Sequence, residues 1–285
     1  MTIGQGLSLD QSSSWEAASL LAFVCRRDPS YLWAHPEQIL TRTQQQLFVH
    51  HLKRLRRGYP LAYLLGEKSF YNHTFKITPS VLIPRPESET IIEIALQELK
   101  TNQYTAYADI GTGSGAIIIS LATAIKQQAP ATYRRSLFIA SDVSAAALKI
   151  ANLNTHRYRL SKKITYHHGD LILPLLKKLL ANRSGKIFLA ANLPYLTPQE
   201  RQQEPSIAAE PTLALVGGRD GLSLYRRLCQ QLQQKLAQQS FYLMMEINPA
   251  QAPALTKIAT KYFPQAQIKK MSDLSGRTRF LAVDK

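Results

Sequence analysis

The chain has few cysteines and no long apolar segment. Its 285 residues include two cysteines, Cys25 and Cys229, which lie far apart and form no metal-ligand spacing. We interpret them as reduced thiols of a cytoplasmic protein. The longest apolar runs, such as Leu20 to Val24, are far too short to cross a bilayer. The first residues have no basic stretch followed by an apolar core, so we expect no secretory signal, no metal site and no membrane association.

Acidic residues are also scarce. The chain has 19 Asp and Glu against 35 Lys and Arg, a formal net charge of +16. This excess favours a nucleic acid or an acidic protein as partner, while a basic proteome or simple solubility accounts for it equally well. The densest positive cluster runs from Lys53 to Arg57. The hydrophobic share of 45% is enough for a folded core in one large domain or two smaller ones.

Residues 1–65 have the pattern of a helical domain. Two segments, Ser13 to Glu16 and Thr43 to Gln46, have the spacing of a capping box. After the second segment, apolar residues recur at helical spacing until Gly58. The pattern therefore predicts a small helical domain whose second capped helix begins near Thr43 and ends before Gly58.

Residues 66–87 change character. Apolar positions such as Phe70 and Phe75 are interleaved with polar ones, and the segment ends in the stiff stretch Ile83 to Pro86. This pattern predicts two short strands that form a β-hairpin linker. The predicted domains are therefore 1–65, the linker 66–87, and 88–285.

From residue 88 the chain alternates helices with apolar strands, which predicts an α/β domain with a mostly parallel sheet covered on both faces. The last two strands, around Ile268 and at Arg279 to Val283, are joined too closely for a parallel crossover and should pair antiparallel. We expect a surface loop at Gln127 to Ser136. The other predicted elements are helices at Ile91–Leu99, Ala116–Ile125, Ala145–Asn154 and Gly221–Gln238, and strands at Tyr107–Ile110, Leu137–Ser141, Ile187–Ala191 and Phe241–Ile247.

A glycine-rich turn follows the first of these strands and opens a helix. Glycines in such a turn can adopt positive φ and let a ligand approach the backbone beside the N-terminal end of the helix dipole. The turn predicts a nucleotide-like cofactor, although Gly111, Gly113 and Ala116 also satisfy the dinucleotide pattern G-x-G-x-x-A. Its residues are Gly111, Thr112, Gly113, Ser114 and Gly115.

Acidic residues at strand ends favour a cofactor other than a dinucleotide. A carboxylate at Asp109 would repel a pyrophosphate but could face a cationic amino acid group. Asp142 comes later than the roughly 20 residues usual for the dinucleotide motif, and it suits the hydroxyls of a ribose. Asp170 ends the next strand. Its position fits a residue that caps a helix or faces solvent as well as it fits a residue that contacts the cofactor. Because the carboxyl ends of parallel strands converge on one crevice, we expect these acids and Asn192 to line one site.

The tetrapeptide Asn192-Leu-Pro-Tyr195 ends the fourth strand of the domain. Pro194 fixes its own φ and holds Leu193 extended, which should aim the Leu193 carbonyl outward. That carbonyl and the Asn192 side-chain oxygen would be two acceptors for the two hydrogens of a substrate –NH2 group. Tyr195 can stack on a planar group. Together with the glycine turn, this motif predicts methyl transfer to a planar amino nitrogen.

These motifs make the chain resemble the protein-(glutamine-N5) methyltransferases of peptide chain release factors, the HemK or PrmC family. The resemblance extends over nearly the whole chain. Its most specific part is the linker, and the family usually has proline where this chain has Leu193. The matching segments are Pro60 to Tyr63, Val81 to Glu87, Glu210-Pro, Gly218 to Leu222, and Leu274 to Arg277 with Arg279.

The resemblance implies a class I S-adenosylmethionine-dependent methyltransferase fold: Rossmann-like, seven-stranded, with an N-terminal helical bundle that docks the substrate and a β-hairpin linker. Gly111 to Gly115 would border S-adenosylmethionine, the product being S-adenosylhomocysteine. Asp142 would hold the ribose, and Asp170 with Leu171 would flank the adenine. Asn192, Leu193, Pro194 and Tyr195 would bind the glutamine of a Gly-Gly-Gln loop. Because only its carbonyl is used, Leu193 should preserve activity while loosening the turn.

The implied partner is a class 1 release factor, and we expect a monomer. The Lys53 to Arg57 cluster would help to dock an acidic release factor. Contact with nucleic acid is compatible with the charge but not required. The nearest alternative is methylation of an exocyclic amine, adenine N6 or guanine N2, in RNA or DNA; DNA enzymes of that kind normally add a recognition domain. A noncatalytic cofactor-binding or RNA-binding protein is the second alternative.

Overall fold

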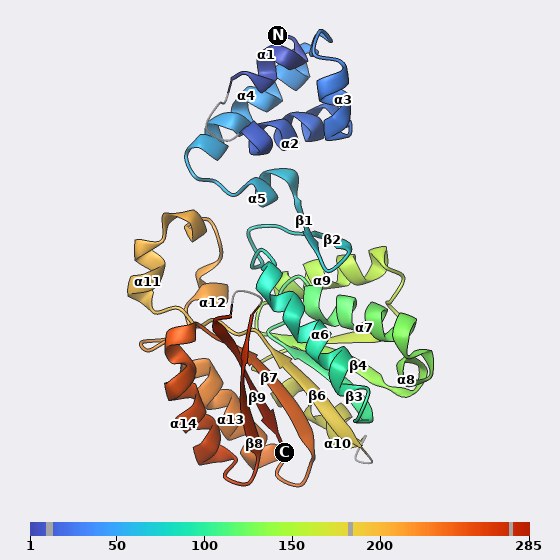
Figure 1. The fold of residues 1–285 in the computed structure, drawn as a ribbon, viewed down its shortest axis with the longest axis vertical. Coiled ribbons are helices and arrows are strands. Elements are labelled where there is room, and N and C mark those ends of the chain that lie inside the picture. Colours follow the sequence, from blue (N-terminus) through green and yellow to red (C-terminus); the bar gives the residue numbers. More distant parts are fainter. Residues whose placement is uncertain (10–13, 182–184, 274–275) are drawn as a thin grey trace. The chain divides into compact units, whose positions relative to one another are not determined.

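The computed structural model describes residues 1–9, 14–181, 185–273 and 276–285 (Figure 1). Two compact units divide the chain. The first contains Met1–Glu67 together with Pro205–Ala209, and the second contains Lys68–Glu204 and Glu210–Lys285. The predicted domain boundaries at residues 65 and 87 remain a prediction. Among the helices of the described residues, none is long and apolar enough to cross a membrane.

The first unit is helical and has its own apolar core, which includes Leu20, Phe48 and Leu52. Its helices in residues 1–67 are α1 (Ile3–Leu7), α2 (Ser14–Cys25), α3 (Pro29–Ala34), α4 (Arg42–Arg56) and α5 (Leu61–Leu65), and Pro205–Ile207 form the 3-10 turn η3.

The cap of α4 corrects one sequence prediction. The predicted capping box at Thr43 is wrong, because the helix begins two residues earlier. Thr41 has extended backbone, its Oγ1 accepts from the Gln44 N–H at 3.2 Å, and the Gln44 side chain accepts from the Thr41 N–H at 2.9 Å. Thr43 therefore lies inside the first turn. The other predicted box includes Ser13, which lies outside the described residues.

The predicted hairpin is present as β1 (Glu67–Phe70) and β2 (His73–Lys76). Its second strand is held by helix α9 (Ala145–Arg157). The Asn154 side chain accepts from the Lys76 N–H at 2.8 Å and donates to the Lys76 carbonyl at 3.0 Å, and Tyr158 bonds in the same two-way manner to Thr74. These contacts fix the direction in which the chain leaves the hairpin towards residues 77–88.

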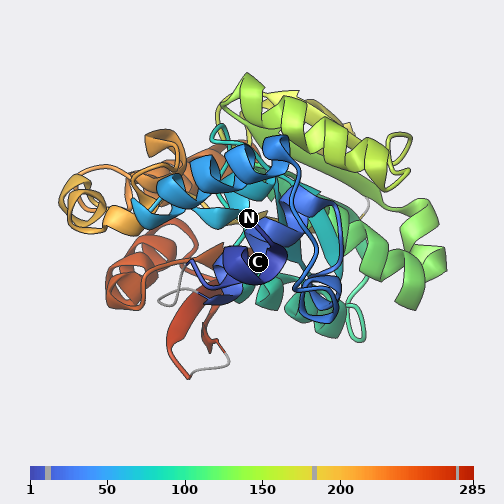
Figure 2. The same cartoon turned by 90° about the horizontal axis from the view of Figure 1, so that it is seen from above.

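A seven-stranded sheet organises the second unit. Its order is β5-β4-β3-β6-β7-β9-β8, parallel except for β9, which is antiparallel to β7 and β8. The predicted fold class, with an antiparallel last pair, is confirmed. The edge strands are β5, which packs against α9, and β8. In Figure 2 the yellow-green helix α9 and the red pair β8 and β9 lie on opposite sides. The strands are β3 (Tyr104–Ile110), β4 (Leu137–Asp142), β5 (Ile164–His168), β6 (Lys186–Ala191), β7 (Phe241–Glu246), β8 (Gln267–Ser272) and β9 (Thr278–Asp284).

Helices cover both faces of this sheet (Figure 1). The remaining helices are α6 (Glu89–Glu98), α7 (Ala116–Gln128), α8 (Pro130–Arg135), α10 (Leu176–Ala181), α11 (Pro198–Gln203), α12 (Thr212–Leu215), α13 (Ser223–Lys235) and α14 (Ala252–Tyr262), with short 3-10 turns η1 (Pro86–Ser88), η2 (Leu173–Leu175) and η4 (Pro249–Gln251). The surface loop predicted at Gln127 to Ser136 is wrong. Pro130 opens helix α8 there, and the Tyr133 ring packs against Phe138 at 5.6 Å between centroids.

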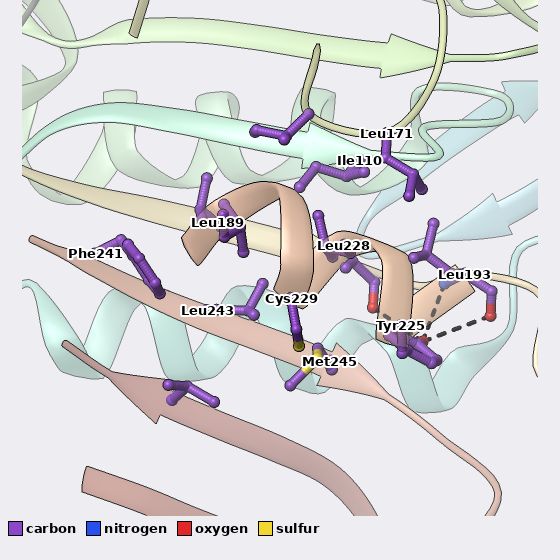
Figure 3. Packing of buried hydrophobic residues seen from close by; sticks show 14 of the residues in the cluster. Ile110, Leu171, Leu189, Leu193, Tyr225, Leu228, Cys229, Phe241, Leu243 and Met245 are labelled. Atoms are coloured by element: carbon purple, nitrogen blue, oxygen red, sulfur yellow. Dashed lines mark hydrogen bonds between the residues drawn. The ribbon is translucent and has the colours of Figure 1, made fainter. Parts of the chain in front are cut away.

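One face of the sheet packs against α13 and α14 through alternate strand residues. Ile110, Leu189 and Leu243 belong to this cluster, together with Leu228 and Cys229 of α13 (Figure 3). The successive strand residues point to opposite faces, so Tyr107, Phe188 and Tyr242 form an aromatic layer on the other face. The core thus fixes the sheet whose carboxyl ends carry the site.

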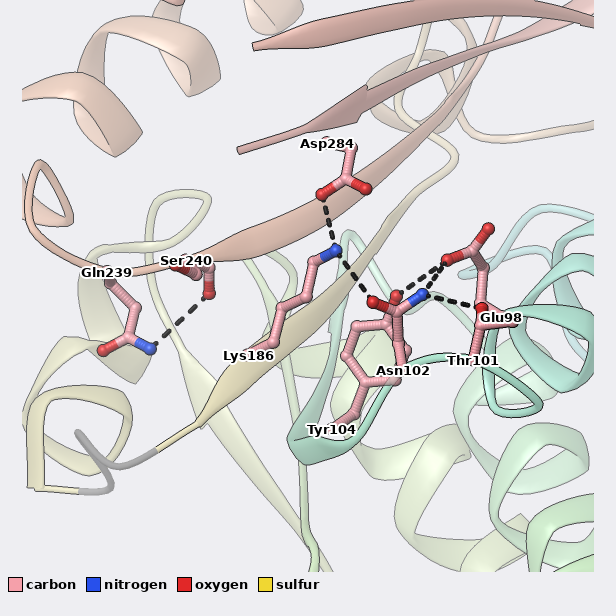
Figure 4. Close-up of polar contacts among 8 residues, drawn as sticks. All are labelled: Glu98, Thr101, Asn102, Tyr104, Lys186, Gln239, Ser240 and Asp284. Carbon is pink, nitrogen blue, oxygen red and sulfur yellow. Dashed lines mark hydrogen bonds and ion pairs between the residues drawn. The ribbon is translucent and has the colours of Figure 1, made fainter. Parts of the chain in front are cut away.

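A polar network closes the opposite end of the sheet (Figure 4). The Lys186 ammonium pairs with the Asp284 carboxylate at 2.5 Å and donates to the Asn102 Oδ1 at 3.3 Å. The Asn102 amide and the Tyr104 hydroxyl both donate to Glu98, at 2.8 and 3.2 Å. Lys186 is the only cation among the residues drawn, and it joins Asp284 to Asn102.

Replacing Lys186 by methionine keeps the aliphatic contacts but leaves partly buried Asp284 unpaired. We expect Lys186→Met to lower the free energy of unfolding by about 1–3 kcal/mol, measured by urea denaturation at unchanged m-value. Lys100→Met, at an exposed position, is the control and should change it by less than about 0.5 kcal/mol. Equal midpoints for the two variants would contradict this account of the network.

Candidate functional site

Two adjoining hollows lie at the carboxyl ends of the parallel strands. The larger has a volume of about 370 Å³ and the smaller about 50 Å³. Gly111, Gly113, Leu82 and Asn192 line both. The glycine turn and Asn192 therefore stand at the junction between the two spaces.

The glycine turn is held against β4. Glycine suits positions 111 and 113 for two different reasons. The N–H groups of Gly111 and Thr112 both donate to the Ser141 carbonyl, at 2.9 and 3.0 Å. Gly111 has φ +76°, and a Cβ there would lie 2.9 Å from the Leu193 side chain. Gly113 has φ +56° and nothing within 4 Å of a Cβ position, so its free space faces the hollows. A ligand can approach the backbone at Gly113.

The other turn residues face inward. Thr112 and Ser114 are buried and line the smaller hollow, and the Asn154 amide donates to the Ser114 carbonyl at 2.8 Å. Gly115 has φ +81° and caps α7 with its backbone in the left-handed region.

Asp109 does not lie where the sequence predicts. Its side chain is 1% exposed, beneath the turn, and Oδ2 accepts from the Thr112 hydroxyl at 2.6 Å. It is absent from the described residues that line either hollow. Burial raises the pKa of this carboxyl to about 7, against the opposing hydrogen bond from Thr112. Asp109 supports the turn from below, because the register of β3 directs it into the layer beneath. The predicted contact with a cationic group stays a prediction.

Asp142 lines the larger hollow and closes the turn. Its Oδ2 accepts from the Gly113 N–H at 2.9 Å and its Oδ1 from the Ser144 N–H at 2.8 Å. Burial raises the pKa of this carboxyl, while these two N–H groups favour its charged form. Each oxygen retains a further acceptor position for a hydroxyl group.

Asp170 and Leu171 line the same hollow. The Asp170 carboxylate pairs with the Arg227 guanidinium and accepts from the Gln231 amide at 2.8 Å, both on α13. Leu171 is buried with φ +49°, in the left-handed region that a leucine rarely adopts. The Ser141 hydroxyl donates to its carbonyl at 2.6 Å. Leu171 therefore holds a strained backbone conformation at the wall of the larger hollow.

Asn192 is fixed by one side-chain hydrogen bond. Its Nδ2 donates to the Ser88 hydroxyl at 2.9 Å, and that hydroxyl donates to the Glu246 carboxylate at 2.5 Å. Within the part of the chain that the structure describes, Oδ1 makes no hydrogen bond, which leaves it available as an acceptor.

Leu193 has a role that proline could not take. Its N–H donates to the Tyr225 hydroxyl at 3.1 Å, and its side chain is 2% exposed against Gly111 (Figure 3). Tyr225 in turn donates to the Glu246 carbonyl. Proline lacks this N–H and could not make the contact; the expected loosening of the turn stays a prediction. The Leu193 carbonyl lies 3.5 Å from the same hydroxyl, too far for a strong hydrogen bond, so its outward role stays a prediction.

Pro194 lines the larger hollow, but Tyr195 is absent from the described lining residues of both hollows. The Tyr195 ring packs against the hydrophobic cluster, and its carbonyl accepts from the Gln251 amide at 2.7 Å. Burial raises the pKa of its hydroxyl to about 12. The predicted stacking of Tyr195 on a substrate therefore remains a prediction.

Glu210 joins two walls of the larger hollow. Its carboxylate is almost fully buried, accepts from the Ile83 N–H at 3.0 Å and pairs with the Arg85 guanidinium. Residues before Ile83 form one wall, and the residues after Glu210 form another: Ser80, Val81 and Leu82 on one side, Pro211, Leu213 and Ala214 on the other.

Sequence reasoning missed the roles of Ser88, Tyr225, Glu246 and Arg227. The signal for Glu246 is a carboxylate at the end of an otherwise apolar strand, because such a charge is rarely buried without a partner. Ser88, Tyr225 and Arg227 carry no such signal, because their neighbours in the sequence do not reveal the distant residues that they contact.

The sheet order, the glycine turn after β3 and the motif after β6 define a class I methyltransferase fold. The PrmC N-terminal domain family matches residues 7–66. A release factor glutamine methyltransferase of Moorella thermoacetica is 35% identical over 270 residues, covering 94% of this chain and 90% of the relative. One of Coxiella burnetii is 32% identical over 268 residues, covering 93% and 90%. The chain therefore belongs to the release factor glutamine methyltransferase family.

A solved structure supports the fold alone. The catalytic domain of human Mettl16, in complex with the MAT2A 3′UTR hairpin 1, aligns with a TM-score of 0.54 at 16% identity. The alignment covers 92% of this chain and 89% of that chain.

Glu210→Gln should loosen the two walls, because an amide cannot accept from both donors that the carboxylate holds. We expect faster hydrogen exchange of the Ile83 amide and a free energy of unfolding lower by about 1–3 kcal/mol. Arg85→Met keeps the acceptor for Ile83 and should show an intermediate exchange rate. Unchanged hydrogen exchange of the Ile83 amide in Glu210→Gln would contradict the role of Glu210 in joining the two walls.

Asp109→Asn should change how stability depends on pH. Between about pH 4 and pH 7, folded Asp109 holds a proton that the unfolded chain has released, so wild-type stability falls as pH rises through this window. The variant keeps an acceptor for Thr112 but carries no charge. Its stability relative to wild type should increase by roughly 2–4 kcal/mol from pH 4 to pH 8, measured by denaturant unfolding. A difference that is constant across this range would refute the assignment.

Proposed function

We propose that this protein transfers a methyl group from S-adenosylmethionine to the side-chain nitrogen (N5) of the glutamine in the Gly-Gly-Gln motif of class 1 peptide chain release factors. The observation that carries the proposal is the position of Asn192. It stands at the junction of the two hollows, with Nδ2 engaged and Oδ1 available as an acceptor. Membership of the family over almost the whole chain supplies the substrate class.

The larger hollow suits the cofactor. Its volume of about 370 Å³ is within the range of small-molecule sites, about 300–1,000 Å³. The open space at Gly113 admits a ligand close to the backbone, and the oxygens of Asp142 retain acceptor positions for ribose hydroxyls. Asp170 and the strained backbone of Leu171 would flank the adenine. Of the turn residues, Gly111 and Gly113 line this hollow and would border the cofactor, whereas Thr112 and Ser114 line only the smaller hollow.

When bound, S-adenosylmethionine would supply an electrophilic methyl group and leave as S-adenosylhomocysteine. The residues of this chain then need to position a weak nucleophile, because an amide nitrogen shares its lone pair with its carbonyl. Asn192 Oδ1 and the Leu193 carbonyl would each accept one hydrogen of the substrate –NH2, which aims the lone pair at the methyl group. The same acceptors would stabilise the positive charge that develops on nitrogen, and the methylated nitrogen would then release one proton to water. A strong base is therefore unnecessary.

The helical unit is the candidate for binding the release factor, in line with the predicted division 1–65, 66–87 and 88–285. Positive charge gathers in the last turn of α4, at Lys53, Arg54 and Arg56. Arg54 is already placed over the Tyr59 ring, 3.9 Å from its centroid. We infer that the cluster attracts an acidic face of the substrate at long range, an effect that salt screens.

Incubation with labelled S-adenosylmethionine tests the function. The wild-type release factor should be labelled, and a release factor in which the Gly-Gly-Gln glutamine is replaced should not. RNA from the same cells is the comparison for the exocyclic-amine alternative. Labelling that ignores the glutamine change, or that goes to RNA instead, would refute the proposal.

Two substitutions separate substrate positioning from cofactor binding. Asn192→Ala should slow transfer by about 100-fold or more and change the cofactor Kd by less than about twofold. Asp142→Ala should weaken cofactor binding by about tenfold or more, roughly 1.4 kcal/mol. Isothermal titration calorimetry and initial rates measure the two effects. The same loss of cofactor affinity in both variants would contradict the separate roles.

A further inference from the structure

A buried chain of hydrogen bonds runs from Asn192 away from the hollows. The Asn192 amide donates to the Ser88 hydroxyl at 2.9 Å, and that hydroxyl donates to the Glu246 carboxylate at 2.5 Å. Ser88 is 2% exposed at the end of η1, and Glu246 is 1% exposed at the end of β7. Ser88 also lines the smaller hollow. Neither residue belongs to the glycine turn or to the tetrapeptide that begins at Asn192.

The direction of each bond in this chain follows from the charge at its far end. An ionised carboxylate can only accept, so the single proton of the Ser88 hydroxyl goes to Glu246. The Ser88 oxygen then presents lone pairs to Asn192, which must donate to them from its NH2 group. The Asn192 oxygen is therefore available to accept a hydrogen bond from a group in the hollow.

The opposite orientation of the Asn192 amide would be inactive. If the amide were flipped, its NH2 group would face the substrate –NH2, and two donors would oppose each other. Oxygen and nitrogen of an amide have nearly the same size, so packing alone discriminates poorly between the two orientations. A polar partner of fixed direction is needed.

We propose that Ser88 and Glu246 are positioning residues that fix the orientation of the Asn192 amide, so that its oxygen faces the substrate amide. This inference rests on the proposed function, because it assigns the acceptor role to Asn192. It extends the site to Ser88, at the junction of η1 and α6, and to β7, two segments that meet only in the folded chain. Ser88 and Glu246 act through Asn192 and need not touch the reacting atoms.

The surroundings of Glu246 make its charge sensitive to pH. Burial raises the pKa of this carboxyl to about 7, while Ser88 and then Arg279 oppose the shift. The other charged groups that act on it are Glu87 and Arg85 of the linker segment, and the Tyr195 hydroxyl also interacts with it. Protonated Glu246 can donate to Ser88, so the hydrogen bonds between Glu246, Ser88 and Asn192 no longer have a fixed direction. Turnover should therefore fall as pH decreases through the pKa of Glu246.

Substitutions of Ser88 test this chain of hydrogen bonds directly. Ser88→Ala removes the hydroxyl and should lower kcat for release factor methylation about 10- to 100-fold, with the cofactor Kd changed by less than about twofold. Ser88→Thr restores a hydroxyl and should recover most of the loss. Ser120→Ala, which removes another fully buried serine hydroxyl with no partner among the described residues, should leave kcat unchanged.

Glu246→Gln supplies a second test that does not depend on Ser88 variants folding. The amide keeps the shape but has no ionisation, so the fall of kcat at acidic pH should disappear and the maximal kcat should be reduced. Asp109→Asn, at another buried carboxyl with a raised pKa, should retain the acidic fall. Folding is checked for every variant by circular dichroism and by cofactor binding.

The outcomes separate this inference from the proposed function. A wild-type protein that does not methylate the release factor glutamine overturns the function. An active wild type with equal kcat in Ser88→Ala, or with Ser88→Thr as slow as Ser88→Ala, overturns the positioning role alone. An acidic fall that persists in Glu246→Gln overturns the role of its charge.

Discussion

The register of three parallel strands is the constraint on which the site depends. Ile110, the last residue of β3, pairs with Ser141 of β4 on one side and with Ala191 of β6 on the other. The next residues, Gly111, Asp142 and Asn192, therefore lie at the same level, at the carboxyl edge of the sheet. A shift of one residue in either pairing would turn the strand's side chains to the opposite face and separate the three. The apolar layers on both faces hold this register, because alternate strand residues are buried in each.

Buried carboxylates stabilise the segments that surround this edge, although the protein has a large excess of positive charge. Asp109 holds the glycine turn through Thr112, Glu210 holds the linker through Ile83 and Arg85, and Glu246 holds Asn192 through Ser88. Glu210 and Glu246 accept from groups that are distant in the sequence, whereas Asp109 accepts from Thr112, three residues further along the chain. Ionised Glu246 can only accept, so it fixes the direction of the hydrogen bond that it receives from Ser88.

The sequence was sufficient for the sheet and for part of the site. Periodicity and strand-helix alternation predicted the strands, and neighbouring strand ends placed Asp142, Asp170 and Asn192 around one hollow. Asp109 could not be placed, because its burial depends on which face of β3 packs against the helices. Helix α8 was missed because its six residues are too short and polar to show an apolar stripe. The contacts of Ser88 with Glu246 and of Ile83 with Glu210 join residues 158 and 127 positions apart, and only tertiary packing creates them.

The central claim is that Asn192 presents a planar amide nitrogen of a release factor for methylation. Localising the transferred methyl group by fragmentation mass spectrometry tests it most directly. Release factor incubated with the wild-type protein and S-adenosylmethionine should gain one methyl group, and the fragments should place it on the side-chain nitrogen of the Gly-Gly-Gln glutamine. A methyl group on any other residue, or an unmodified glutamine alongside methylated RNA, would contradict the account.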